Sequence, residues 1–518
     1  MLFSADLLYF AKSEVKLMSN ENQLKRKTIF GLLWSFMDMF MSQGVQFLVL
    51  MVLARLLSPE HFGVIGMVII FIAISNTIID SGFTQALVRE TNASQEDYST
   101  VFFFQLLLAV VMCSLLNSLA PLISGFFHEE QLIPILRVLS LGLIIHSLGI
   151  IQRIMLIKQI NFRTQTKINV LSGVVASIVA ISCALLGFGV WSLVAQSLTL
   201  QTMQTLLLWL SNKWMPSFVF SFQSFKRLFG FGSKLLISGL IDTIYSQVYA
   251  VIIGRMYPAA RLGYYTNASK LSDVIVISAT SALQRVTYPV LSSIQEEKER
   301  LSLSFQKMIR TSAYFMFPVM IGLMAIADTL IPLIFGDQWF ESIIYFKLLC
   351  VAGMLYPLHA INLNMLQVKG RSDLFLILEI IKKVLITTLI AISLFFSLGI
   401  IGLIGAAIVS SYLSFYLNAY FSAREISYSV MAQVKDVFPM LLISIIMGGI
   451  VYLLGGVLPD EPFLKLGVQI SAGIVLYVTF SRMFKIKELK MIYELIVPMV
   501  QAVVRKKPFS VLLKSKGR

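Results

Sequence analysis

Hydrophobic runs of about 20 residues fill most of the chain, and short polar connections separate them. A helix that crosses a membrane needs about 20 mostly apolar residues, because each backbone amide must bond within its own segment. The pattern predicts spans near residues 29–54, 62–83, 100–124, 132–156, 166–187, 190–210, 230–254, 271–293, 311–335, 342–366, 374–396, 400–421, 437–457 and 463–481. The expected fold is therefore an all-α integral membrane protein with about 14 transmembrane helices.

The composition supports a membrane protein. Of the 518 residues 57% are hydrophobic and 13% are charged, whereas soluble domains average about 25% charged residues. The net charge of +15 is explained by membrane topology and by attraction to anionic membrane lipids. Only three aromatic residues lie in the basic tail at residues 482–518, and we expect no nucleic-acid partner.

The distribution of basic residues predicts the orientation. Most Lys and Arg residues between the spans fall on the side that holds both termini, which makes that side cytoplasmic. The opposite side holds only Arg55, Arg255, Arg261 and Lys270. Residues 1–28 are then a cytoplasmic segment without a signal peptide, with Met18 as an alternative start, and residues 482–518 are a basic cytoplasmic tail.

One pattern occurs twice, at an offset of 200 residues. VLARLLSPEHFGVIGM (Val52–Met67) and IIGRMYPAARLGYYTN (Ile252–Asn267) both run from an apolar helix through an arginine and a turn to a glycine. We infer an N-lobe at 29–210, a linker at 211–229, a C-lobe at 230–421 and an additional helix pair at 437–481. Two parallel six-helix lobes related by a pseudo-two-fold axis enclose a central cavity and suit alternating access.

Several motifs resemble those of one transporter family. They are DSGFTQALVRE (Asp80–Glu90), GFGVWSLVAQSL (Gly187–Leu198), QRVTYPVLSSIQEEKERL (Gln284–Leu301) and LIFGDQWFESIIYFKLLCVAGML (Leu333–Leu355). Between Met18 and Arg482 the chain resembles polysaccharide exporters of the colanic-acid exporter type, within the multidrug/oligosaccharidyl-lipid/polysaccharide exporter superfamily.

The resemblance implies a flippase of the bacterial inner membrane. Its substrate would be an undecaprenyl-pyrophosphate-linked oligosaccharide repeat unit, used for O-antigen, capsule or exopolysaccharide, and a polymerase and a chain-length regulator would be partners. The resemblance also implies a positively charged cavity lined by the spans at 29–54, 62–83, 230–254 and 271–293.

Those four spans contain ionisable residues, each of which costs at least about 2.5 kcal/mol inside a membrane unless it has a partner or a function. The candidates for substrate binding are Arg285, Lys234, Gln284, Arg55 and Arg255, and the carboxylates are Asp38, Asp80, Asp242 and Asp273. Arg285 either grips the diphosphate through paired hydrogen bonds or forms an ion pair with one of the carboxylates. Lys234 either meets the diphosphate or snorkels to the headgroups.

The remaining candidates also have two explanations each. Arg55 and Arg255 either contact the substrate at the outer mouth or stabilise the negative end of a helix dipole. The carboxylates either bind H⁺ or Na⁺ to couple an ion gradient, or balance Arg285. Outside these spans, Glu379 precedes Lys382 by three residues and Lys383 by four, which predicts an ion pair with one of them within one helix.

Catalysis is not expected. The predicted extracytoplasmic connections are short, the four histidines have no metal or catalytic-triad spacing, and no P-loop is present. We therefore expect no cofactor, no metal site and no disulfide among the three cysteines. Two alternatives stay open: an ion-coupled multidrug or organic-cation exporter of the same superfamily, and a membrane-embedded glycan polymerase or glycosyltransferase.

Overall fold

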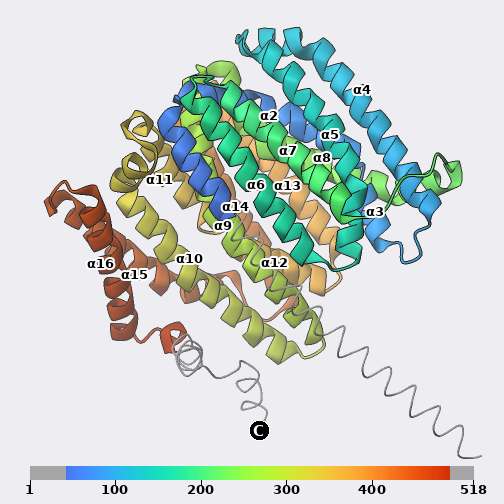
Figure 1. Ribbon diagram of the computed structural model, residues 1–518. Helices are drawn as coiled ribbons and strands as arrows, with labels where there is room; N and C mark the ends of the chain where they lie inside the picture. Colours follow the sequence, from blue (N-terminus) through green and yellow to red (C-terminus); the bar gives the residue numbers. More distant parts are fainter. Residues whose placement is uncertain (1–42, 491–518) are drawn as a thin grey trace, which may run out of the picture. The chain divides into compact units, whose positions relative to one another are not determined.

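The computed structural model describes residues 43–490, except for the side chains of residues 282, 285, 286 and 372. Every regular element in this range is a helix, which confirms the all-α class (Figure 1). A first helix at Gln43–Leu56 precedes α2. The others are α2 (Pro59–Asp80), α3 (Phe83–Arg89), α4 (Gln95–Phe127), α5 (Leu132–Lys158), α6 (Phe162–Leu185), α7 (Trp191–Ser211), α8 (Phe222–Met256), α9 (Ala259–Ser293), α10 (Lys298–Phe335), η1 (Asp337–Trp339), α11 (Ser342–Gly353), α12 (Tyr356–Val368), α13 (Ser372–Phe395), α14 (Gly399–Glu425), α15 (Val430–Val457) and α16 (Pro462–Met483).

Ten helical segments of the described chain are long and apolar enough to cross a membrane, so this is a multi-pass membrane protein. The predicted span at 342–366 corresponds to two helices, α11 and α12, and Pro357 lies in the first turn of the second. Proline disfavours a helical residue before it, which explains the break there. The helices α7, α9 and α13 are not among the ten, and much of 29–54 lies outside the described residues. The number of fourteen therefore stays a prediction.

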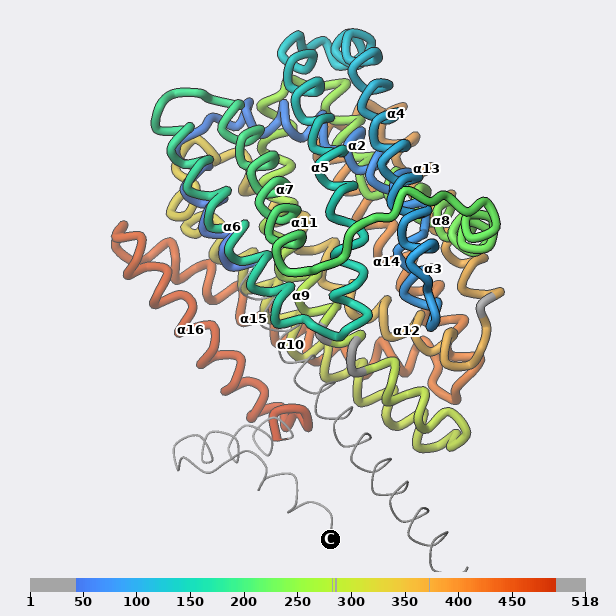
Figure 2. The backbone as a smooth tube through the Cα atoms, turned by 45° about the vertical axis from the view of Figure 1, so that its right-hand side comes forward, coloured from blue at the N-terminus to red at the C-terminus, as the bar shows by residue number. Residues whose placement is uncertain are grey.

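The chain forms two compact units, and the boundary between Thr266 and Asn267 lies inside α9. In the first unit α4 and α5 run side by side, and α2 packs against α8 (Figures 1 and 2). Helix α8 begins at Phe222, so the second part of the predicted linker at 211–229 is helical. The lobe boundaries inferred from the repeat stay a prediction.

The start of α4 is fixed by a capping box and an ion pair. The Asp97 N–H donates to Ser94 Oγ at 3.1 Å, and the Ser94 N–H donates to the Asp97 carboxylate at 2.9 Å. Such reciprocal bonds satisfy amides that have no partner within the helix. Arg227 Nη2 lies 2.5 Å from Asp97 Oδ1, so the same carboxylate joins α4 to α8.

In the second unit, α10 is joined to the C-terminal helices by a cluster that we call the Arg310 cluster: Arg310, Asp436, Glu488, Gln306 and Tyr428. Arg310 donates to both Glu488 oxygens, at 2.6 and 3.1 Å, and to Asp436 Oδ1 at 3.4 Å. Gln306 Nε2 and Tyr428 Oη both donate to Asp436 Oδ2, at 2.6 and 2.7 Å. Burial, together with the hydrogen bond from Tyr428 to Asp436, raises the pKa of Tyr428. The cluster connects α10, the start of α15 and the segment after α16.

Candidate functional site

The predicted repeat is present in the backbone. The first helix ends at Leu56 and α2 begins at Pro59, and 200 residues later α8 ends at Met256 and α9 begins at Ala259. Burial follows the same pattern. Residues 53 and 54 are buried and residues 55 and 56 are exposed; 200 residues later, 253 and 254 are buried and 255 and 256 are exposed. The offset read from the sequence therefore relates two equivalent helix–turn–helix segments.

These two segments meet at equivalent positions, which we call the glycine crossing: Pro59, Gly63, Ala259 and Gly263. A Cβ added to Gly63 would lie 1.7 Å from the Ala259 carbonyl oxygen, and one added to Gly263 would lie 1.8 Å from the Pro59 carbonyl oxygen. Real Cβ atoms do not approach so closely, so both positions require glycine. Each repeat thus places its glycine against the backbone of the other repeat.

Helix α8 also approaches the backbone closely at the end of α2. A Cβ on Gly82 would lie 2.4 Å from the Gly232 carbonyl oxygen, and Gly82 has a φ of +71°. Between this contact and the glycine crossing, one polar bond joins α2 to α8, with Thr77 Oγ1 and Thr243 Oγ1 3.0 Å apart. Small residues let helix backbones come close within a membrane, and a hydroxyl pair adds a bond without a buried charge.

Three of the predicted polar residues belong to this helix pair. Asp80 lies at the end of α2, half-buried, and accepts a hydrogen bond from Thr84. Lys234 and Asp242 lie on α8 with exposed side chains. Within residues 43–490, Lys234 forms no ion pair. The structure therefore brings one predicted cation and two predicted carboxylates to the same packed helix pair.

The two repeat arginines lie at helix ends and are exposed. Arg255 is in the last turn of α8, where a cation stabilises the negative end of the helix dipole. Its Nη1 is 3.0 Å from His128 Nε2, and its guanidinium lies over the Phe126 ring at 5.2 Å. These contacts fit the helix-end explanation for Arg255, and its contact with the substrate stays a prediction.

The other predicted residues belong to the second unit or lie outside the description. Asp273 and Gln284 are exposed on α9, and Ser269 Oγ donates to Asp273 Oδ2 at 3.1 Å. Arg285 is part of the same helix, but its side chain lies outside the described residues, as does the whole of Asp38. A cavity shared by all the candidates therefore stays a prediction.

The first unit also contains a polar pocket that the sequence reasoning did not assign. It lies between the first helix, α6 and α7, and its polar lining includes Gln46, Asn169, Gln196 and Gln204. Its volume of about 30 Å³ is enough for about two water molecules. Arg153 Nη2 donates to Gln204 Oε1 at 3.1 Å. The sequence contains a signal for this pocket, because Asn169, Gln196 and Gln204 are polar amide residues inside the apolar spans predicted at 166–187 and 190–210.

Metal-ion chemistry has no candidate site in the described part of the chain. No group of three His, Cys, Asp or Glu side chains lies close enough there to hold a metal ion. All three cysteines are free thiols, Cys113 and Cys350 buried and Cys183 partly buried. The predicted pair within α13 is confirmed, because Lys382 donates to Glu379. The candidate site within the described residues is therefore the set of close helix contacts around α2 and α8, with polar side chains beside them.

Solved structures show the fold. A structure described as "Lipid II flippase MurJ, inward closed conformation" has a TM-score of 0.71 at 16% sequence identity, over 88% of this chain and 98% of its own. An inward-facing multidrug resistance transporter of the MATE family and MOP superfamily has a TM-score of 0.57 at 18% identity, over 75% of this chain and 95% of its own. The chain therefore has the fold of these membrane transporters.

Sequence comparison shows the family. A family profile described as "Polysaccharide biosynthesis protein" matches residues 52–344, more than half of the chain, and the chain belongs to that family. The teichuronic acid biosynthesis protein TuaB of Bacillus subtilis strain 168 is 28% identical over 77% of this chain and 84% of its own length. The lipopolysaccharide biosynthesis protein WzxC of Escherichia coli strain K12 is 25% identical over 76% and 81%. The resemblance to polysaccharide exporters is confirmed.

Proposed function

We propose that this protein is a flippase for a lipid-linked oligosaccharide. It carries an undecaprenyl-pyrophosphate-linked repeat unit across the bacterial cytoplasmic membrane by alternating access, for the synthesis of a surface polysaccharide. Both termini face the cytoplasm, and a polymerase and a chain-length regulator act on the product. Its role is transport and not catalysis.

The observation that carries this proposal is the agreement of relatives and fold over most of the chain. Relatives covering about three quarters of it are named for teichuronic acid and lipopolysaccharide biosynthesis, and the fold matches a lipid II flippase over 88% of the chain. The glycine crossing adds physical support, because two parallel repeats in contact at equivalent residues are compatible with alternating access by rocking of one repeat against the other. In the predicted topology the crossing lies on the outer side and closes it.

In this proposal Arg285 grips the diphosphate, and Lys234 and Gln284 add contacts along the path. Guanidinium suits the task because its planar donors match phosphate oxygens in pairs. Arg55 and Arg255 contact the substrate at the outer mouth as it leaves. Asp38, Asp80, Asp242 and Asp273 balance these cations or bind the H⁺ or Na⁺ that resets the empty carrier.

The test is flipping of a fluorescent undecaprenyl-pyrophosphate oligosaccharide in proteoliposomes, with and without proton and Na⁺ gradients. We expect Arg285→Ala to lower the rate at least about tenfold, since charge-assisted bonds contribute about 1.5–3 kcal/mol. Arg285→Lys should retain part of the rate, and Arg55→Ala should have a milder effect. The matched control is Arg300→Ala, because the Arg300 pair with Glu297 is exposed.

Each outcome decides between the proposals. A normal flipping rate in Arg285→Ala would contradict the proposal that Arg285 binds the diphosphate. A lower flipping rate in both Arg285→Ala and Arg300→Ala would indicate a general defect. The MATE likeness makes a multidrug exporter the second candidate. Transport of small organic cations without any flipping would establish that alternative. A rate that does not respond to either gradient would remove ion coupling from the proposal.

A further inference from the structure

A pocket of about 360 Å³ opens at one end of the second unit. Three chain segments border it: the start of α10, the end of α12, and the connection between α14 and α15. In the predicted topology all three segments lie on the cytoplasmic side. The volume is within the range of about 300–1,000 Å³ that is typical of small-ligand sites. None of the residues proposed for the translocation path lines it.

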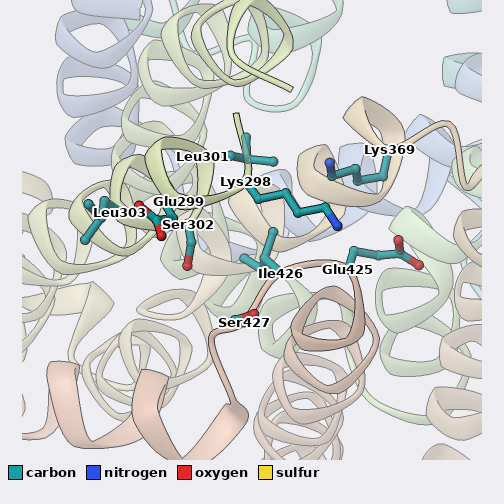
Figure 3. A pocket seen from close by; sticks show the side chains of 9 residues that line it. All are labelled: Lys298, Glu299, Leu301, Ser302, Leu303, Lys369, Glu425, Ile426 and Ser427. Atoms are coloured by element: carbon teal, nitrogen blue, oxygen red, sulfur yellow. The ribbon is translucent and has the colours of Figure 1, made fainter. Parts of the chain in front are cut away.

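Two lysines provide the charge of this pocket. Lys298 and Lys369 reach into it from α10 and α12, and their nitrogens lie on the same side of it (Figure 3). Lys369 Nζ donates to the Gln295 carbonyl oxygen at 2.8 Å, a neutral partner. Lys298 forms no ion pair within residues 43–490. Neither ammonium group is therefore paired with a carboxylate of the described residues, and both have donors left for a ligand.

The acidic groups of the pocket are directed elsewhere. Arg371 Nη1 holds Glu425 Oε1 at 2.9 Å, and the Glu425 carboxylate points away from the two lysine nitrogens (Figure 3). Glu299 lies at the other end of the pocket, beside Ser302 and Leu303 (Figure 3). The lysine end is consequently the part of the pocket that attracts an anion.

Apolar side chains form the rest of the wall. Leu301 and Ile426 are buried, and Leu303 is exposed at 66%. A pocket with ammonium groups at one end and aliphatic surface beside them fits an amphiphile better than a fully hydrated ion. Phosphate is the anion that ammonium groups bind as point charges, and anionic lipids concentrate at the cytoplasmic surface.

We propose that this pocket binds a phosphate group, supplied by the headgroup of an anionic phospholipid, between Lys298 and Lys369. The site is separate from the translocation path, and the proposal does not depend on what the protein transports. The bound lipid would hold together the three segments that border the pocket.

The test is native mass spectrometry of the delipidated full-length protein titrated with phosphatidylglycerol. Near a charged surface each lysine changes affinity about fivefold, so Lys298→Ala/Lys369→Ala should weaken binding about 30-fold. Lys298→Arg/Lys369→Arg keeps both charges and should bind. The matched control is Lys307→Ala, because Lys307 is exposed on α10 and does not line the pocket. Lys298→Ala alone leaves the bond from Lys369 to Gln295 intact and serves if the double variant does not fold.

Competition identifies the source of the phosphate. If inorganic pyrophosphate displaces the lipid weakly, the result supports a headgroup site. If pyrophosphate binds as tightly as the lipid, the phosphate comes from a soluble compound and the lipid source is overturned. Equal lipid affinity in wild type, Lys298→Ala and the double alanine variant overturns the site altogether. Because this measurement contains no transport step, its failure is distinguishable from failure of the flippase proposal.

Discussion

In the first unit, α2 meets α8 and the start of α9 through glycines and a threonine pair, whereas in the second unit α10 is joined to the C-terminal helices through Arg310 and two carboxylates. The first kind of contact depends on shape, because nothing can be added at a glycine whose missing Cβ would overlap a carbonyl oxygen. The second depends on charge, because a partly buried arginine compensates Glu488, whose side chain is 8% exposed. One chain therefore uses two means of holding helices, which fail under different substitutions.

The largest effect is expected at the glycine crossing. Gly63→Ala or Gly263→Ala places a Cβ within 1.8 Å of a carbonyl oxygen, so the backbones must separate. We expect each to cost about 3 kcal/mol or more, at the upper end of overpacking, as a fall in Tm of the detergent-solubilised protein. The control is Gly125→Ala, because a Cβ there meets nothing within 4 Å. Equal Tm values for Gly63→Ala and Gly125→Ala would contradict the crossing.

The next effect belongs to the Arg310 cluster. Arg310→Met leaves Glu488 and Asp436 without their cation, and we expect a loss of about 2 to 3 kcal/mol in stability, measured as a lower Tm. Adding Glu488→Gln should recover part of the loss, because it removes one uncompensated charge. Lys307→Met on the same helix serves as the control, since Lys307 is exposed. A neutral Arg310→Met would mean that the cluster does not hold the C-terminal helices.

A smaller effect is expected for the bond between Thr77 and Thr243. Replacing either threonine by valine keeps the shape and removes a neutral hydrogen bond, at a cost of about 1 kcal/mol. In a double-mutant cycle the second valine should add little, because the bond is already lost. Thr388→Val is the control, because Thr388 bonds only to its own helix and is exposed. Fully additive losses would show that the hydroxyls act independently.

The smallest effect is expected at the exposed pair of Arg371 and Asp373. The guanidinium hydrogen bonds lower the pKa of Asp373, with Nε–Oδ1 and Nη2–Oδ2 both at 3.2 Å. A lowered pKa means that the pair stabilises the fold above the ordinary carboxyl range near pH 4, and that this contribution is lost as the pH falls through the lowered value. The Tm difference between wild type and Asp373→Asn should therefore shrink from pH 6 toward pH 3. A Tm difference that stays constant from pH 6 to pH 3 would contradict this pH dependence.

Much of the fold was predictable because a membrane restricts the choices. Apolar length alone locates most helices, and the repeat offset read from Arg55 and Arg255 is reproduced at both turns. The ion pair between Glu379 and Lys382 followed from spacing along one helix. These features are local or periodic, and the sequence displays both directly.

Contacts between distant segments were not predictable in the same way. Nothing in the spacing indicates that Arg310 meets Glu488 or that Lys298 lies near Lys369, because these pairs depend on helix packing. In the repeated pattern Gly63 and Gly263 stand after each turn, and the pattern alone does not show that they admit the backbone of the other repeat. The joint cavity of Arg285, Lys234 and the carboxylates stays a prediction, because the two units are described separately.

The glycine crossing also resembles the interface of a symmetric homodimer. In such a dimer residue i of one subunit touches residue j of the other, and j touches i. Here Gly63 faces Ala259 and Gly263 faces Pro59, with the two subunits replaced by two repeats of one chain. In a homodimer one mutation changes both sides of the interface. In this chain a mutation in one repeat changes one side only, and the unchanged residues of the other repeat must accommodate it.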